Sequence, residues 1–150
     1  MIYYTMESNG HAQLPAITKE QKAEVIIVSD LSQYREIDYD DRSELISERL
    51  KNIIWRYMPN HVFQPVIYLN TNNNEQAIYW RFKPPVYCDL IADFRNDGIV
   101  SHISFPSNHA PIVFSVLSPK GKRSIIVRVA VAESVLRRGV SGLRFTEVAV

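Results

Sequence analysis

Residues 41–59 read DRSELISERLKNIIWRYMP, and this stretch carries the strongest helical pattern in the chain. Asp41 and Glu44 have the three-residue spacing of a capping box at its start. Apolar side chains then recur at helical spacing, at Leu45, Ile46, Leu50, Ile53, Ile54 and Tyr57. Pro59 ends the pattern. The sequence therefore predicts one long amphipathic helix over about 42–58, with its apolar face packed on a sheet.

Short runs rich in Val, Ile, Tyr and Trp lie on both sides of this helix and predict strands. The runs 62–69 and 76–82 flank the Asn-rich stretch 70–75, which predicts a hairpin because Asn tolerates left-handed backbone geometry. The run VIIV at 25–28 fits a strand buried on both faces. Further strands are predicted over 1–6, 86–94, 99–105, 112–117, 124–129 and 142–148.

Residues 130–138 predict a short C-terminal helix, with Gly139 as its C-terminal cap. Strands and helices of this kind predict an α+β fold with a mostly antiparallel sheet. The length of 150 residues and the absence of any repeat or linker predict a single globular domain, 1–150. Because 46% of the residues are hydrophobic, the core needs no disulfide or metal.

The charge balance and the length of the apolar runs argue against nucleic acid and membrane as partners. Seventeen basic and sixteen acidic residues give a net charge of +1, which does not favour nucleic acid, whose binders carry a basic face. The longest apolar runs are strand-sized, so we expect no membrane partner. The N-terminal residues lack a secretory pattern and Cys88 is the one cysteine, so we expect a cytoplasmic location.

The sequence contains no recognisable catalytic, metal or phosphate-binding motif. Its four histidines are scattered, so we expect no metal site and no cofactor. One enzymatic alternative stays open: a small hydrolase-like enzyme could use Asp89 or Asp93 together with His102 or His109. A cleft that brings these side chains within hydrogen-bonding reach would favour it.

Two loops are the candidate partner-binding sites. The first is the acidic segment, residues 36–41, in which we expect Tyr39 to be exposed as an aromatic anchor among carboxylates. The second is the predicted hairpin loop. The candidate contact residues are Glu36, Asp38, Tyr39, Asp40, Asp41, Asn72 and Asn73.

The C-terminal third resembles a known family. FSV at 114–116, IIV at 125–127, a short helix ending near Leu136 and GLRFTEV at 142–148 follow one another. This order is similar to the closing segment of bacterial polymorphic-toxin immunity proteins, in particular the groups called immunity protein eleven and immunity protein forty-three. Residues 80–94 are loosely similar to their central portion, and Arg128 stands where the family tends to have a serine that caps the helix.

The resemblance implies a function based on binding. A protein of this family binds and neutralises a cognate secreted toxin, of a contact-dependent or type VI secretion system, and it has no catalytic residues. The expected function is thus steric occlusion of a toxin. The alternatives are the hydrolase-like enzyme above and an accessory protein of a phage or secretion system. The oligomeric state is not predicted.

Overall fold

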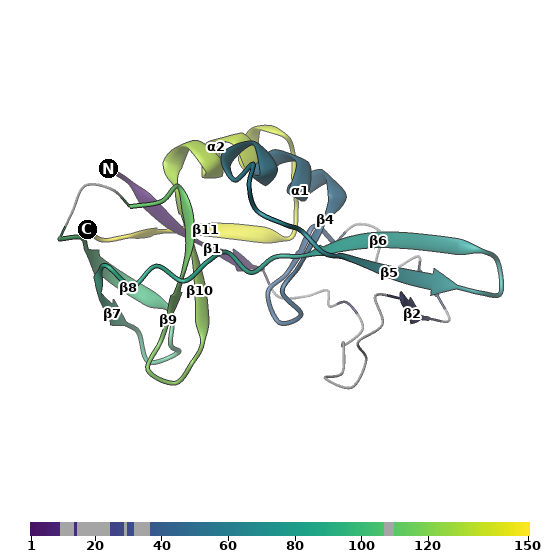
Figure 1. The fold of residues 1–150 in the computed structure, drawn as a ribbon, viewed down its shortest axis with the longest axis horizontal. Coiled ribbons are helices and arrows are strands. Elements are labelled where there is room, and N and C mark those ends of the chain that lie inside the picture. Colours follow the sequence, from purple (N-terminus) through teal and green to yellow (C-terminus); the bar gives the residue numbers. More distant parts are fainter. Residues whose placement is uncertain (10–13, 15–24, 29, 32–36, 107–109) are drawn as a thin grey trace.

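The computed structural model of the chain describes residues 1–9, 14, 25–28, 30–31, 37–106 and 110–150. It shows an α+β fold with mostly antiparallel sheets and short helices (Figure 1). Helices α1 and α2 lie side by side over one sheet, and the hairpin β5–β6 extends away from them.

The first sheet, sheet A, contains strands from both ends of the chain in the order β11-β1-β10-β9. Its strands are β1 (Tyr3–Ser8), β9 (Val113–Leu117), β10 (Arg123–Arg128) and β11 (Leu143–Val148), all paired antiparallel. The strands predicted at these places are confirmed, with ends shifted by one or two residues.

The second sheet, sheet B, has the order β2-β5-β6-β4-β3. Its strands are β2 (Val25–Ile27), β3 (Tyr39–Asp40), β4 (Leu45–Ser47), β5 (Pro65–Asn70) and β6 (Glu75–Arg81). Only the β2–β5 pair is parallel. The predicted Asn-rich hairpin is confirmed, and Asn74 has the left-handed backbone geometry that the loop requires, with φ 57°.

A smaller hairpin joins β7 (Ile91–Phe94) to β8 (Val100–Ser104). Gly98 has φ 83° in its turn, and its N–H donates to the carbonyl of Arg95 at 2.9 Å. Beyond the end of β11, the N–H of Ile103 donates to the carbonyl of Ala149 at 2.9 Å, so this hairpin lies beside sheet A.

The long helix predicted over 42–58 is wrong. The structure has strand β4, then helix α1 (Glu48–Ile54) and a 3₁₀ turn η1 (Trp55–Tyr57). The cap is Ser47, whose side chain accepts a hydrogen bond from the N–H of Leu50 at 3.1 Å, and the predicted cap Asp41 has no such role. Glu44 has φ 56°, a left-handed geometry that no helix interior allows.

Helix α2 (Val129–Arg137) confirms the short C-terminal helix. Gly139, with φ 66°, follows its end as predicted. Arg128 occupies the N-cap of this helix without a side-chain capping bond. One of its guanidinium nitrogens donates instead to the carbonyl of Ala110 at 2.5 Å.

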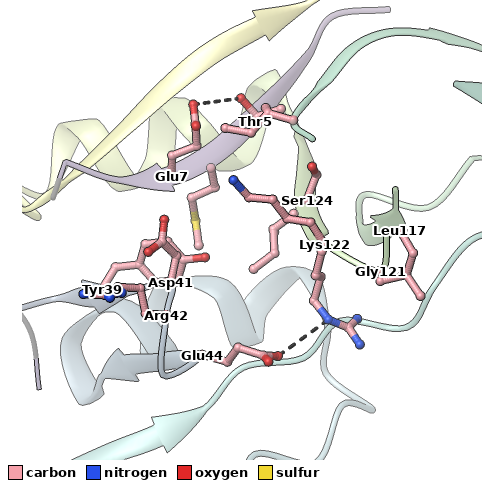
Figure 2. A pocket seen from close by; sticks show the side chains of 14 residues that line it. Thr5, Glu7, Tyr39, Asp41, Arg42, Glu44, Leu117, Gly121, Lys122 and Ser124 are labelled. Atoms are coloured by element: carbon pink, nitrogen blue, oxygen red, sulfur yellow. Dashed lines mark hydrogen bonds and ion pairs between the residues drawn. The ribbon is translucent and has the colours of Figure 1, made fainter. Parts of the chain in front are cut away.

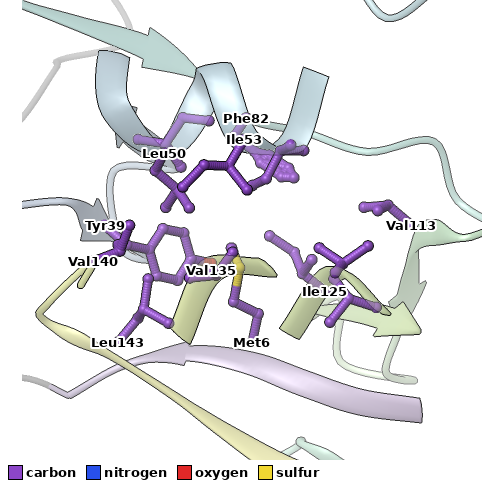
Figure 3. Packing of buried hydrophobic residues seen from close by; sticks show 14 of the residues in the cluster. Met6, Tyr39, Leu50, Ile53, Phe82, Val113, Ile125, Val135, Val140 and Leu143 are labelled. Atoms are coloured by element: carbon purple, nitrogen blue, oxygen red, sulfur yellow. The ribbon is translucent and has the colours of Figure 1, made fainter. Parts of the chain in front are cut away.

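The central core lies between the helices and the two sheets (Figure 3). Figure 3 shows Tyr39 between the helix residues Leu50 and Ile53 and the strand residues Met6 and Leu143. A second cluster packs the β7–β8 hairpin against sheet A, and a third covers the opposite face of sheet B. Sheet B is therefore packed on both faces near β4, where Ile46 enters the central core and Leu45 the third cluster.

Candidate protein-binding surface

The acidic segment contains a buried carboxylate rather than an exposed contact loop. Asp38 is buried, and its carboxylate accepts hydrogen bonds from Ser47 Oγ at 2.7 Å and from the N–H of Ser141 at 2.9 Å. It also forms an ion pair with Arg49, which raises the pKa of that guanidinium. Asp38 therefore holds the start of α1 to the segment before β11. Its buried side chain is not placed on the surface as a contact for a partner.

Tyr39 and Asp40 are buried as well, so the expectation that Tyr39 is exposed is wrong. Tyr39 fills the central core from strand β3. Burial raises the pKa of its hydroxyl, and the nearby carboxylates of Asp41, Glu44 and Asp40 raise it further. The carboxylate of Asp40 accepts from the N–H groups of Leu14 at 2.9 Å and Arg42 at 3.0 Å, and so stabilises the β3–β4 turn.

The remaining candidate residues lie on two separate surfaces. Asp41 is exposed in the β3–β4 turn, whereas Asn72 and Asn73 are exposed at the tip of the β5–β6 hairpin. Strand β4 pairs with the Arg81 end of β6, and the tip is at the opposite end. At about 3.4 Å per residue, the tip is roughly 20 Å from β4. These residues do not form one site, and Glu36 lies outside the described residues.

Sheet B instead exposes apolar side chains on one face. The register places Val25 beside Ile67 and Ile67 beside Ile78, and the next row pairs Ile27 with Leu69. Residues that are register partners point to the same face of a sheet. We name this set the exposed apolar face; its members are Val25, Ile27, Ile67, Leu69 and Ile78.

The exposed fractions confirm this orientation. Ile27 is 70% exposed, Val25 45% and Ile78 36%, and Ile67 and Leu69 between them are half-buried, whereas Ile26 on the other side of β2 is buried. The expectation that this strand is buried on both faces is therefore wrong. The alternation within β2 was hidden because each of its residues is apolar.

The face is exposed because helix α1 is short. Near β4, the same face of the sheet carries Ile46 and Trp80, which pack in the central core. The ammonium group of Lys51 on α1 lies 4.1 Å from the centroid of the Trp80 ring. Farther along the hairpin the helix no longer covers the sheet (Figure 1). The helix predicted over 42–58 therefore gave no indication that this part of sheet B is exposed.

A cavity of about 450 Å³ lies between β1, β10 and the β3–β4 turn (Figure 2). Figure 2 shows the carboxylates of Glu7, Asp41 and Glu44 and the side chain of Lys122 around it. One oxygen of Glu44 is buried without a hydrogen bond, and Arg123 Nε is 3.6 Å from it. The positive φ of Glu44 places its carboxylate here, and no sequence pattern predicted it. Charges of both signs line the cavity, so it offers polar contacts without selecting one charge.

The residues of the enzymatic alternative are only partly brought together. Asp93 and His102 are register partners in the β7–β8 hairpin, but His102 Nδ1 is 3.7 Å from Asp93 Oδ2, longer than a hydrogen bond. Both side chains are exposed. His109 lies outside the described residues. Within the described part of the chain, no group of three or more His, Cys, Asp or Glu side chains is placed to hold a metal ion.

None of the helices in the described part of the chain has the length and apolar character needed to span a bilayer. Comparison with protein-family models and with curated proteins found no match for this chain.

Proposed function

We propose that this chain is a protein-binding domain, and that its partner is a cognate bacterial toxin that it neutralises by steric occlusion in the cytoplasm. The observation that carries the proposal is the exposed apolar face of sheet B. A contiguous apolar area of this kind is typical of surfaces that another protein covers.

The geometry of the face suits a protein partner. Its side chains are β-branched or leucine, and they stand on paired strands that hold them in fixed positions. Such side chains lose little conformational entropy on binding, so more of the burial free energy contributes to affinity. Polar groups flank the face, since Gln76 belongs to the same row as Leu69. An apolar centre with polar flanks is the usual anatomy of an interface.

The resemblance to immunity proteins supports the choice of a toxin as partner. The segments that carry the resemblance form β9, β10, α2 and β11, a continuous part of sheet A with its covering helix. These segments lie away from the exposed apolar face, which is built from β2, β5 and β6. A shared scaffold with a separate recognition surface fits a role in which each immunity protein recognises its own toxin.

Co-expression with the toxic domain encoded next to this chain's gene tests the proposal. We expect survival and a complex that co-purifies. Rescue without a complex would favour an enzyme that reverses the damage, and no rescue would overturn the proposed function.

A matched pair of variants tests the surface itself. Ile27 and Ile91 are the same residue type with nearly equal exposure, 70% and 71%, but Ile91 lies on β7, outside sheet B. We expect Ile27→Lys to weaken toxin binding by at least about tenfold, because it places a charge in an apolar interface. Ile91→Lys should leave the affinity unchanged. Equal affinities for both variants would remove the exposed apolar face from the interface.

A further inference from the structure

The outer edge of strand β6 has no partner strand over Gln76–Ile78 in the part of the chain that the structure describes. Strand β4 pairs with this edge only opposite Tyr79, Trp80 and Arg81. On its other side, β6 pairs with β5 along its full length. This stretch of β6 is thus an open edge, a feature that proteins usually shield because it can pair with another strand.

The edge is open because the chain leaves the sheet at Ser47. This residue has extended geometry, with φ −67° and ψ 162°, and its side chain caps α1. Its N–H donates to the carbonyl of Asp38 at 2.8 Å, and the buried Asp38 carboxylate accepts from its hydroxyl. The strand is therefore turned into a helix at a position held by several hydrogen bonds, and β4 does not continue along β6.

The hydrogen-bonding groups of this edge are set by the strand register. The N–H of Arg81 donates to the carbonyl of Gln64 at 2.8 Å, so the backbone groups of Arg81 face β5. In an antiparallel pair these groups alternate between the two sides of a strand. Ala77 and Tyr79 therefore also face β5, whereas Gln76 and Ile78 direct their N–H and C=O groups to the open edge.

Space for an added strand lies beside these groups. A groove of about 760 Å³ is lined by Gln76–Tyr79 together with Ser47, Arg49 and Ser141. A three-residue strand is roughly 10 Å long, which matches the stretch Gln76–Ile78 that has no partner strand in the described part of the chain. The side chain of Ile78 belongs to the exposed apolar face, so the open edge and the apolar face adjoin one another.

We propose that an extended segment of the partner protein adds to sheet B along the open edge of β6, in line with β4. Its backbone pairs with Gln76 and Ile78, and its alternate apolar side chains continue the exposed apolar face. The inference rests on the proposed function, because it states how the toxin is held. A strand with alternating apolar residues is the chemistry that both features recognise.

A proline substitution removes the N–H on which this pairing depends. Gln76 is exposed and its N–H faces away from β5, so Gln76→Pro leaves the hairpin bonds in place and proline is tolerated on a strand edge. Gln76→Ala is the matched control, because it removes the same side chain and keeps the N–H. With the toxic domain encoded beside the gene as the probe, we expect Gln76→Pro to lose at least about tenfold in affinity. Gln76→Ala should bind as the wild type does.

Amide hydrogen exchange of the wild-type chain provides a readout that needs no variant. In the free protein, the amides of Gln76 and Ile78 should exchange quickly and those of Ala77 and Tyr79 slowly. Binding of the toxic domain should protect Gln76 and Ile78.

The other outcomes distinguish a failure of strand addition from a failure of the proposed function. A tight wild-type complex in which Gln76 and Ile78 stay unprotected, or equal affinities of the two variants, overturns strand addition and leaves the proposed function intact. Absence of both rescue and complex overturns the proposed function and this inference with it. Protection that rises with the concentration of the chain alone identifies a second copy as the occupant and overturns the toxin assignment.

Discussion

The acidic segment and the exposed apolar face differ from what their compositions predict. Asp38, Tyr39 and Asp40 are buried, although they belong to the most acidic stretch of the chain. Val25 and Ile27 are exposed, although they belong to one of its most apolar stretches. The carboxylates are buried because backbone and side-chain donors satisfy them, whereas the apolar residues are exposed because neither helix of the described chain extends over them. Local composition therefore did not determine which segment faces solvent.

The largest expected effect comes from removing the carboxylate of Asp38. Asp38→Ala leaves the Ser47 hydroxyl and the Ser141 N–H without their acceptor, and we expect the free energy of unfolding to fall by about 2–3 kcal/mol. Arg49 adds little to this value because its side chain is 54% exposed. Urea denaturation measures the effect. Glu133→Ala, on the exposed side of α2, is the control, with a change within about 0.5 kcal/mol. Similar losses in both variants would contradict the distinction between buried and exposed carboxylates.

The next effect is a loss of stability at alkaline pH caused by Tyr39. Its pKa is raised in the folded chain, so above pH of about 10 the unfolded chain releases a proton that the folded chain keeps. The free energy of unfolding should then fall by about 1.4 kcal/mol per pH unit for this group. Tyr39→Phe should remove the part of this pH dependence that Tyr39 causes. The part caused by Tyr79, whose pKa is also raised by burial, should remain. Denaturation curves between about pH 9 and pH 11 check this, and parallel pH profiles of the two proteins would argue against burial of Tyr39.

The smallest expected effect on stability is at the exposed apolar face. We expect Ile27→Thr to change the free energy of unfolding by less than about 0.5 kcal/mol, because the side chain already contacts solvent. Ile26→Thr, one residue earlier, places a hydroxyl in the third core cluster and should cost about 2 kcal/mol. Thermal or urea unfolding of these two variants measures the two losses and so shows which face of β2 is buried. A larger loss for Ile27→Thr than for Ile26→Thr would reverse the assignment of the two faces.

Much of the strand pattern was predictable from the sequence. The β5–β6 hairpin follows from its Asn-rich loop, and α2 follows from its apolar pattern and Gly139. The helix over 42–58 was wrong at its start because Leu45 and Ile46 fit two patterns. Adjacent apolar residues lie on one helical stripe, but they also suit a strand that is buried on both faces. The pairing of β4 with β6, which lies about thirty residues farther along the chain, decides between them.

The candidate site was less predictable than the fold. The burial of Asp38 depends on Ser141, a hydrogen-bond partner more than one hundred residues away in sequence. The exposure of Ile27 depends on where α1 ends. No local sequence pattern indicates the burial of Asp38 or the exposure of Ile27. Asp41 and Asn73 are exposed as expected, because turn residues with satisfied side chains commonly face solvent.

The place of β1 in sheet A has a consequence for how the chain is made. It lies between β10 and β11, so β1 pairs with strands that are synthesised more than one hundred residues after it. The β5–β6 hairpin can form from neighbouring residues much earlier during synthesis. The β5–β6 hairpin of sheet B can thus assemble early on the nascent chain, whereas sheet A closes only after β10 and β11 have been made. Until that point Tyr3 and Met6 lack their partners, and the emerging chain depends on its early hairpin for order.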